Sequence, residues 1–407
     1  CVGGGRTTER TVRAIRTTHV GSLPRPKELL DANARRAEIG EDEFARIPQD
    51  SVDEVVRRQH AIGIDVVNDG EYGHIMTESV DYGAWWFYSF SRFGGLELTT
   101  DQRFDMAPPA AGGKIALAPF SNRRDWERFA DAYSDPDSGI HVARQGRKAS
   151  TFPTIVAPLT YIGQDAVQRD IDGLKKALAE NKLDPADAFV ASLSPGSAAR
   201  ISNAYYDNDV EVVEACAEVL HEEYKALTDA GLTVQIDDPS IAEAWDQVNP
   251  EPTVEDYRDY IQVRIDAVNK ALEGIPEDLV RFHVCWGSWH GPHTTDIPLA
   301  DIVDKVLQVR ARGITFEAAN ARHEHEWTVW HEIDVPEDKV LIPGVVGHST
   351  NVVEHPELVA QRIRHFVDAV GPDRVIASTD CGLGGRVYPS IAWAKLESLA
   401  TGARLVG

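Results

Sequence analysis

The sequence predicts an α/β protein that folds as a (β/α)8 barrel of the TIM type, in a single domain with inserted loops. Two observations carry this prediction. From residue 209 onward, apolar segments of strand length alternate with amphipathic helical segments, and the joins between them are short. Such alternation indicates parallel strands connected by crossover helices. Eight or nine strand candidates over 407 residues then point to one barrel.

The strand candidates are short apolar or β-branched runs. They lie at 15–20, 64–71, 154–160, 188–193, 232–236, 281–287, 313–317, 340–346 and 374–379. Apolar positions at helical spacing predict helices over about 209–231, 254–272, 299–311 and 356–370. Thr253 is expected to cap the second of these helices.

The domain boundaries follow from composition. Residues 1–14 are rich in Gly, Arg and Thr without a period, which predicts a loose N-terminal arm. The barrel is expected over 15–407, with insertions at about 72–150 and 161–208. The sequence offers one strand candidate too many, and we expect 188–193 to belong to an inserted active-site segment. No linker rich in Gly, Pro or Ser separates the units, so one domain is expected.

Composition excludes several classes of partner. The chain is 43% hydrophobic, as expected for a globular protein with a full core. Its formal charge of −24 makes nucleic acid and anionic membranes poor partners.

No apolar run is long enough to span a bilayer, and no signal-peptide segment opens the chain. Four cysteines in so long a chain favour reduced thiols, available for metal, in a cytoplasmic protein.

Polar residues at the predicted strand ends suggest a metal site, because function in such a barrel lies at the carboxyl ends of the strands. His283 and Cys285 are two residues apart on one strand and therefore share a face. Glu317 and Cys381 close two other strands. These four side chains make a nitrogen, sulfur and oxygen set that agrees with zinc.

The same strand ends carry further candidates: His19 and Ser22, Glu71, Asp237, His348 and Asp380. Asp237 and Asp238 cannot both face the barrel interior on a regular strand. Pro239 biases Asp238 toward extended geometry, and Asp237 is the preferred inward residue.

The donor set favours sulfur chemistry over hydrolysis. Two thiolates and a carboxylate outweigh the charge of Zn²⁺, so the filled site is electron-rich. A thiol that coordinates the ion loses its proton and would stay nucleophilic as a zinc-bound thiolate.

Other polar and aromatic residues have simpler interpretations. Cys216 lies on an apolar helix face and is expected in the core. His290 and His293 are assigned to a solvated Gly/Pro loop, and His323 and His325 to a charged surface stretch. The aromatic cluster 85–90 is either core or a lid over the barrel mouth.

Several motifs together resemble a known family. The sequences at 283–285, 314–317 and 379–383 resemble the zinc motifs of the C-terminal barrel of cobalamin-independent methionine synthase. The sequence at 235–239 resembles its substrate-binding strand end, 18–24 its first strand and 69–71 its second. The resemblance covers roughly 15–390. It is closer to the single-barrel methionine synthase II-like proteins, which include epoxyalkane:coenzyme M transferases.

The resemblance implies a zinc-dependent methyl- or alkyltransferase that acts on a small thiol. By it, His283, Cys285, Glu317 and Cys381 bind the metal. Glu71 and Asp237 would hold an amino or other polar group of the substrate, and the Gly21–Ser22 backbone its far end. His348 resembles the proton donor to the leaving group.

This chain departs from the methionine synthases in three ways. They have Glu where Asp238 stands and Asp near Gly347, and the full-length synthases carry an additional N-terminal barrel. The donor is therefore open, with folate possible. The alternatives are epoxide opening by a thiol, as in the coenzyme M relatives, and a non-catalytic zinc- or thiol-binding barrel. A homo-oligomer is possible.

Overall fold

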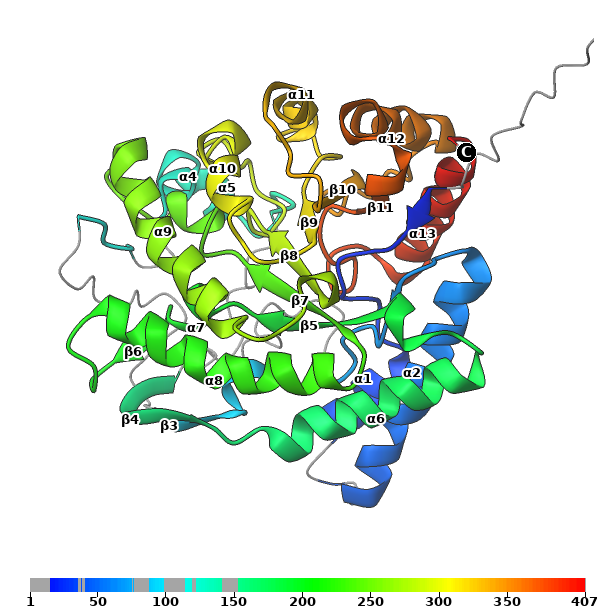
Figure 1. Cartoon of the computed structure of the whole chain (residues 1–407), viewed down its shortest axis with the longest axis horizontal. Coiled ribbons are helices and arrows are strands. Elements are labelled where there is room, and N and C mark those ends of the chain that lie inside the picture. Colours follow the sequence, from blue (N-terminus) through cyan, green and yellow to red (C-terminus); the bar gives the residue numbers. More distant parts are fainter. Residues whose placement is uncertain are drawn as a thin grey trace, which may run out of the picture.

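The computed structural model describes residues 15–35, 38, 41–74, 76, 88–98, 114–118, 122–140 and 153–406. Over these residues, eight strands form one parallel sheet that curls around a central axis, with helices on its outside (Figure 1). The strands follow one another around the sheet in the order β1 (Arg16–Thr17), β11 (Ile376–Thr379), β10 (Val340–Val346), β9 (Gly313–Phe316), β8 (Val280–Val284), β7 (Thr233–Asp238), β5 (Ala188–Leu193) and β2 (Val67–Asn68).

The first and last strands of this order meet through the backbone. The amides of Asp65 and Val66, just before β2, both donate to the carbonyl of Thr17 on β1, at 3.1 and 3.0 Å. These hydrogen bonds join the two edges of the sheet, which would otherwise carry unpaired backbone groups. The predicted (β/α)8 barrel is confirmed. The arm predicted at 1–14 and Trp85, Trp86 and Phe87 of the aromatic cluster lie outside the described residues.

The assignment of 188–193 to an insertion is wrong, because this segment is the barrel strand β5. The supernumerary candidate is instead β4 (Pro153–Tyr161), which pairs with β3 (Phe93–Leu98) and β6 (Ser202–Asn203) in a separate sheet. Both candidates are apolar runs, so the sequence alone could not separate them. Their surroundings differ. All six residues of β5 are buried, as in a strand covered on both faces, whereas exposed and half-buried residues alternate along the second half of β4.

The helices enclose the barrel. They are α1 (Lys27–Ala34), α2 (Glu41–Ile62), α4 (Arg124–Arg128), α5 (Ala130–Ser134), α6 (Gln164–Glu180), α7 (Pro195–Ala198), α8 (Asp209–Asp229), α9 (Val254–Ala271), α10 (Val303–Val306), α11 (Val329–Glu332), α12 (Pro356–Val370) and α13 (Pro389–Arg404). Short 3₁₀ turns lie at η2 (Pro185–Asp187), η3 (Glu243–Trp245), η4 (Glu277–Leu279), η5 (Leu299–Asp301), η6 (Glu324–Thr328) and η7 (Pro372–Arg374). None of the described helices has the length and apolar character needed to cross a bilayer.

Local sequence explains where the long helices begin and end. The hydroxyl of Thr253 accepts from the amide of Asp256 at 3.1 Å, which confirms the predicted cap of α9. Gly371 ends α12 at φ +85°, a backbone conformation that glycine adopts without strain. The helix expected over 299–311 is wrong in its extent, since only η5 and α10 form there. Cys216 is fully buried in the hydrophobic core, as expected.

Candidate metal centre

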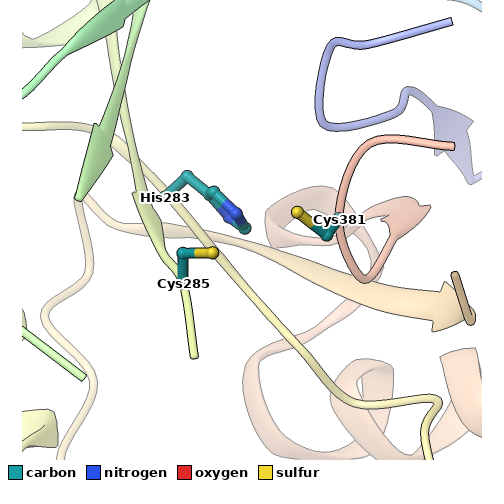
Figure 2. Close-up of side chains that lie close together, drawn as sticks. All are labelled: His283, Cys285 and Cys381. Carbon is teal, nitrogen blue, oxygen red and sulfur yellow. The ribbon is translucent and has the colours of Figure 1, made fainter. Parts of the chain in front are cut away.

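The ends of two strands, β8 and β11, bring one imidazole and two thiols together. His283 lies on β8 and Cys285 follows that strand, so their side chains leave the same face. Cys381 follows β11, on the far side of β9 and β10 in the sheet order. Figure 2 shows the three side chains pointing toward one another from these two strand ends. Their ligand atoms all lie within 4.8 Å of each other.

His283 gives the clearest sign of a missing partner. The side chain is 1% exposed, and neither of its ring nitrogens has a hydrogen-bond partner within the described part of the chain. A buried polar group without a partner costs free energy, roughly 1–3 kcal/mol. An ion placed between His283 and the two thiols would supply that partner, and nitrogen with sulfur is the donor set that zinc prefers. The residues present therefore fit a zinc ion.

The two thiols differ in acidity. A hydrogen bond from the Cys285 thiol to the Cys381 sulfur lowers the pKa of Cys381 well below its usual value and raises that of Cys285. The imidazole of His283 adds to the lowering at Cys381. Cys381 is thus the thiolate of the pair, and thiolates are the form in which cysteine binds metals.

Glu317 lies in an adjoining group rather than within the three-residue cluster. Its ligand atoms lie within 4.8 Å of those of His348 and Asp380. One carboxylate oxygen accepts from the amide of Trp286 at 3.3 Å and the other from Nδ2 of Asn320 at 2.6 Å. Burial raises the pKa of this carboxyl group, and the charge of Cys381 raises it further. Glu317 therefore borders the cluster, and its role as fourth ligand stays a prediction.

Asp380 holds the segment that carries Glu317. One of its carboxylate oxygens accepts from the amides of Ala318 and Ala319 at 2.7 and 2.8 Å, and the other accepts from Asn320 at 3.1 Å. All of these partners follow β9. Asp380 is thus occupied by the protein itself, which leaves it as a support for the neighbouring ligands. The sequence drew no attention to Asn320.

The buried carboxyl group of Glu71 and the half-buried one of Asp237 both lie near Cys381. Asp237 is the register partner of His283 in the adjoining parallel strand, so it faces the same side. Burial raises the pKa of Glu71 to about 8 and that of Asp237 well above its usual value, and each is further raised by the charge of Cys381. Asp238 instead accepts from Ser240 and Ser197 on the opposite face. This placement agrees with the choice of Asp237 as the inward residue.

Gly21 is what lets Glu71 approach the first strand end. A Cβ atom on Gly21 would lie 2.2 Å from Oε1 of Glu71, and the φ angle of +136° is one that other residues rarely adopt. Glu71 itself has φ +58°, a strained value for a non-glycine residue. Such strain at a strand end is common at functional sites.

His19 and Ser22 are the other predicted substrate-binding residues, and they differ in burial and in their hydrogen bonds within the protein. Nδ1 of His19 accepts from the amide of Gly21 at 3.1 Å, so Nε2 donates to the amide oxygen of Gln59 at 2.7 Å. Burial lowers the pKa of His19 to about 3, and the neutral ring serves to shape the loop. Ser22 is only half-buried.

His348 lies two residues beyond β10, next to Glu317 and Asp380. Burial lowers its pKa to about 3, so the ring is neutral. Its Nδ1 atom is buried and lacks a hydrogen-bond partner among the described residues. A neutral imidazole offers one N–H donor and one lone pair, which suits it to accept a proton and pass one on.

The assignment of His323 to a surface stretch is wrong. His323 is 3% exposed, with Nδ1 2.8 Å from Glu326 and Nε2 3.1 Å from Asp296. Its ring also packs on Trp286, next to the ligand strand. The 3₁₀ turn η6 produces this burial, because it turns His323 and Glu326 to the same side. His325 is exposed, as expected, and His290 and His293 are half-buried.

Comparison with known proteins places this chain among methionine synthases and related proteins. Residues 158–404 match the family model described as the catalytic domain of cobalamin-independent synthase. A methionine synthase of Thermococcus kodakarensis is 25% identical over 397 residues, covering 96% of this chain and 93% of the relative. A 2-hydroxypropyl-CoM lyase of Xanthobacter autotrophicus is 22% identical over 427 residues, covering 96% and 95%.

The fold has a counterpart among solved structures. A B12-independent methionine synthase from Shewanella sp. W3-18-1, solved in complex with selenomethionine, superposes with a TM-score of 0.64 at 20% identity. The match covers 97% of this chain and 98% of that one. The family model spans more than half of the sequence and the barrel is shared. This chain therefore belongs to the family of cobalamin-independent synthase catalytic domains.

Proposed function

We propose that this protein is a zinc-dependent transferase that alkylates a small thiol, with methyl transfer as the preferred reaction. The observation that carries the proposal is the cluster of His283, Cys285 and Cys381, in which the nitrogens of a buried imidazole lack a regular hydrogen bond on the described chain and lie beside two thiols. The methionine synthases among its relatives support methyl transfer to a thiol such as homocysteine.

His283, Cys285 and Cys381 would hold the ion, and Glu317 would complete the set. When bound, zinc supplies a positive charge that lowers the pKa of a substrate thiol and keeps its sulfur nucleophilic. Glu71 and Asp237 lie on the same side as Cys381 and would fix an amino or other polar group of the substrate. Fixing the reactants in this way lowers the barrier by removing freedom of motion before the reaction.

His348 would take part in proton transfer to the leaving group. In the reaction a sulfur–carbon bond forms and the bond from that carbon to its leaving group breaks. The thiol proton must leave sulfur, and the leaving group must gain one. The imidazole of His348, whose Nδ1 atom is buried without a partner on the described chain, would relay a proton to the leaving group.

Metal coordination tests the proposal directly. The full chain, loaded with zinc or cobalt, is titrated with homocysteine, coenzyme M and neutral thiols, and a change in the metal spectrum is expected when a thiol binds. Cys285→Ser and Cys381→Ser should lose the metal and all alkyl transfer with the fold kept. Cys216→Ala is the matched control, because that thiol is buried in the core, and it should keep both. Full metal content and activity in both serine variants would refute the assignment.

A second reaction rests on a specific relative. The 2-hydroxypropyl-CoM lyase of Xanthobacter autotrophicus covers the chain as completely as the methionine synthases do. A thiol activated at the same cluster could therefore open an epoxide, with His348 protonating the oxygen. Product analysis with an epoxide and with methyl donors, folates included, separates the two reactions.

A further inference from the structure

A buried histidine contacts the carboxyl group of Glu71. His74 is 3% exposed, and its Nδ1 atom lies 3.5 Å from Oε2 of Glu71. The amide of His74 also donates to the backbone carbonyl of Glu71 at 3.0 Å. The turn that follows β2 therefore holds both the main chain and the side chain of Glu71.

The contact between His74 and Glu71 suits either charge state of the carboxyl group. Burial lowers the pKa of His74 well below its usual value, and the charges of Arg25 and Arg92 lower it further, so the ring is neutral. A neutral imidazole nitrogen either donates an N–H or accepts through its lone pair, depending on the tautomer. Nδ1 can thus donate to an ionised Glu71 or accept from a protonated one. The orientation of Glu71 is kept when the group becomes the anion that an ammonium group requires.

The imidazole of His74 is itself held by an aromatic ring. The rings of His74 and Tyr88 pack with their centroids 4.0 Å apart. The main chain also comes close, since a Cβ atom on Gly73 would lie 3.3 Å from the Tyr88 ring. The hydroxyl of Tyr88 donates to the carboxylate of Asp170 on α6. Tyr88 therefore restricts the movement of His74 and is tied to a helix outside the barrel.

Arg92 connects Tyr88 to the rest of the fold. Its guanidinium lies 3.8 Å from the centre of the Tyr88 ring and pairs with Asp170. Its Nη1 atom donates to Glu223 on α8 at 2.8 Å, and Glu223 also accepts from Ser192 on β5 at 2.6 Å. Arg92 and Glu223 are each 4% exposed. Breaking a buried ion pair of this kind is costly, so the network holds one geometry firmly.

Tyr88 and Arg92 come just before β3, in the small sheet of β3, β4 and β6 that lies beside α8 (Figure 1). The amide of Ile162, just after β4, donates to the carbonyl of Arg92 at 2.8 Å. A Cβ atom on Gly163 would lie only 2.6 Å from that of Arg92. A sheet that is not part of the barrel therefore reaches a substrate-binding carboxyl group through a short series of packed side chains.

We infer that His74 is a positioning residue for Glu71. Through Arg92 and Tyr88, the sheet of β3, β4 and β6 keeps His74 in place and so sets how tightly the site binds the ammonium group of an amino-bearing thiol. The inference rests on the proposed function for the role of Glu71. A carboxyl group that is oriented before the ligand arrives does not have to be ordered on binding, which strengthens the complex.

Calorimetric binding of two matched thiols to the zinc-loaded full chain tests this role. Homocysteine and 4-mercaptobutyrate share the thiol, the chain length and the carboxylate, and only homocysteine carries an amino group. Wild type should bind homocysteine ~10-fold or more tighter, the usual effect of a charged hydrogen bond. His74→Leu fills the space without a hydrogen-bonding atom. It should lose most of this preference and keep the affinity for 4-mercaptobutyrate.

Three further variants separate positioning from packing. His74→Asn places an amide nitrogen near the position of Nδ1 and should retain the preference, although it loses ring contact. Tyr88→Leu removes the ring that holds His74 and should reduce the preference. His60→Leu is the control, because His60 is exposed near the end of α2, and it should bind both thiols as wild type does.

Two results would overturn the inference. One is equal affinity of wild type for the two thiols, and the other is a full preference for homocysteine in His74→Leu. An equal loss of affinity for both thiols in that variant would count against it in the same way, since it would indicate general damage to the site. If His74→Leu does not fold, Tyr88→Leu decides, because an effect of that ring on Glu71 passes through His74.

Failure of the proposed function would give a different result. Loss of the amino preference in His74→Leu, with no change in the spectrum of a cobalt-loaded protein when thiols bind, would uphold the positioning role and refute thiol activation at the metal. A spectral change with both thiols, and no preference in wild type, would do the reverse.

Discussion

Two buried histidines behind the barrel mouth have opposite surroundings. His283 is 1% exposed and His323 is 3% exposed, so both are removed from water. His323 has a carboxylate at each ring nitrogen, Glu326 on one side and Asp296 on the other. Neither nitrogen of His283 has a hydrogen-bond partner in the described structure, and two thiols lie within 4.8 Å of it instead.

The difference separates a structural histidine from one prepared for an external ligand. Buried polar groups in folded proteins are nearly always satisfied by the protein or by water. His323 follows that rule, and its ring stabilises the segment after β9. His283 departs from it within a sulfur-rich cluster, where a bound ion would satisfy its ring nitrogens. Burial alone therefore does not distinguish the two kinds of histidine; the hydrogen-bond partners of the ring nitrogens do.

The largest expected effect comes from removing the unsatisfied histidine. His283→Ala should weaken zinc binding by ~100-fold or more, because a zinc site is worth roughly 10–16 kcal/mol and one ligand carries about a quarter of it. The metal-free chain should lose little stability, because the cost of the cavity is offset by removal of a buried polar ring that lacks a regular hydrogen bond. Competition with a chelator measures the affinity, and denaturation in the chelator's presence measures stability. Unchanged zinc affinity would remove the basis of the comparison.

The satisfied histidine should show the converse behaviour. His323→Gln leaves Asp296 and Glu326 buried without their shared cation, which should cost about 3 kcal/mol of unfolding free energy. Zinc binding should be reduced far less than in His283→Ala. Denaturant titration gives the stability, and His325→Gln is the matched control, because His325 is exposed two residues away and should have no effect. Equal stability of the two variants would show that the network contributes nothing.

The pH dependence of stability sharpens the same contrast. Burial opposes the charge of His323, but its hydrogen bonds to Asp296 and Glu326 prevail and raise its pKa to about 10, from 6.5. The folded state therefore binds the proton more tightly, so this contribution is fully present below pH 6.5 and is lost as the pH rises through 10. About 2 kcal/mol should disappear between pH 7 and 9. In His323→Gln this alkaline loss should be absent; an identical pH profile in the variant would assign it to other groups.

The smallest effect is expected at Asn320, whose side-chain amide links the carboxylates of Glu317 and Asp380. Asn320→Ala removes the donor to Glu317 at 2.6 Å and to Asp380 at 3.1 Å. Stability should fall by about 1 kcal/mol and zinc affinity by ~10-fold, typical of a residue that orients a ligand. Isothermal titration with zinc measures the second effect. Asn269→Ala, which loses a hydrogen bond to the carbonyl of Gln308 on the barrel's exterior, should leave the affinity unchanged.

Sequence patterns located the cluster because its three side chains lie near the carboxyl ends of regular strands. The alternation of side chains along β8 placed His283 and Cys285 on one face, and the barrel prediction placed Cys381 at the same end. The same patterns failed at His323, where alternating His and Glu residues resemble an exposed stretch. They also failed at β5, whose apolar run is indistinguishable from that of β4 before strand pairing is known.

The sequence by itself determined the class of fold and the kinds of atom at the strand ends, because both depend on local periodicity and residue type. Only the tertiary structure decided which of those atoms meet. It separated Glu317 from the three-residue cluster, occupied Asp380 with backbone amides and docked the loop after Cys381 onto Ser22. The physical reason is that such contacts depend on the register of neighbouring strands and on the path of the loops, which are fixed by packing across the whole barrel.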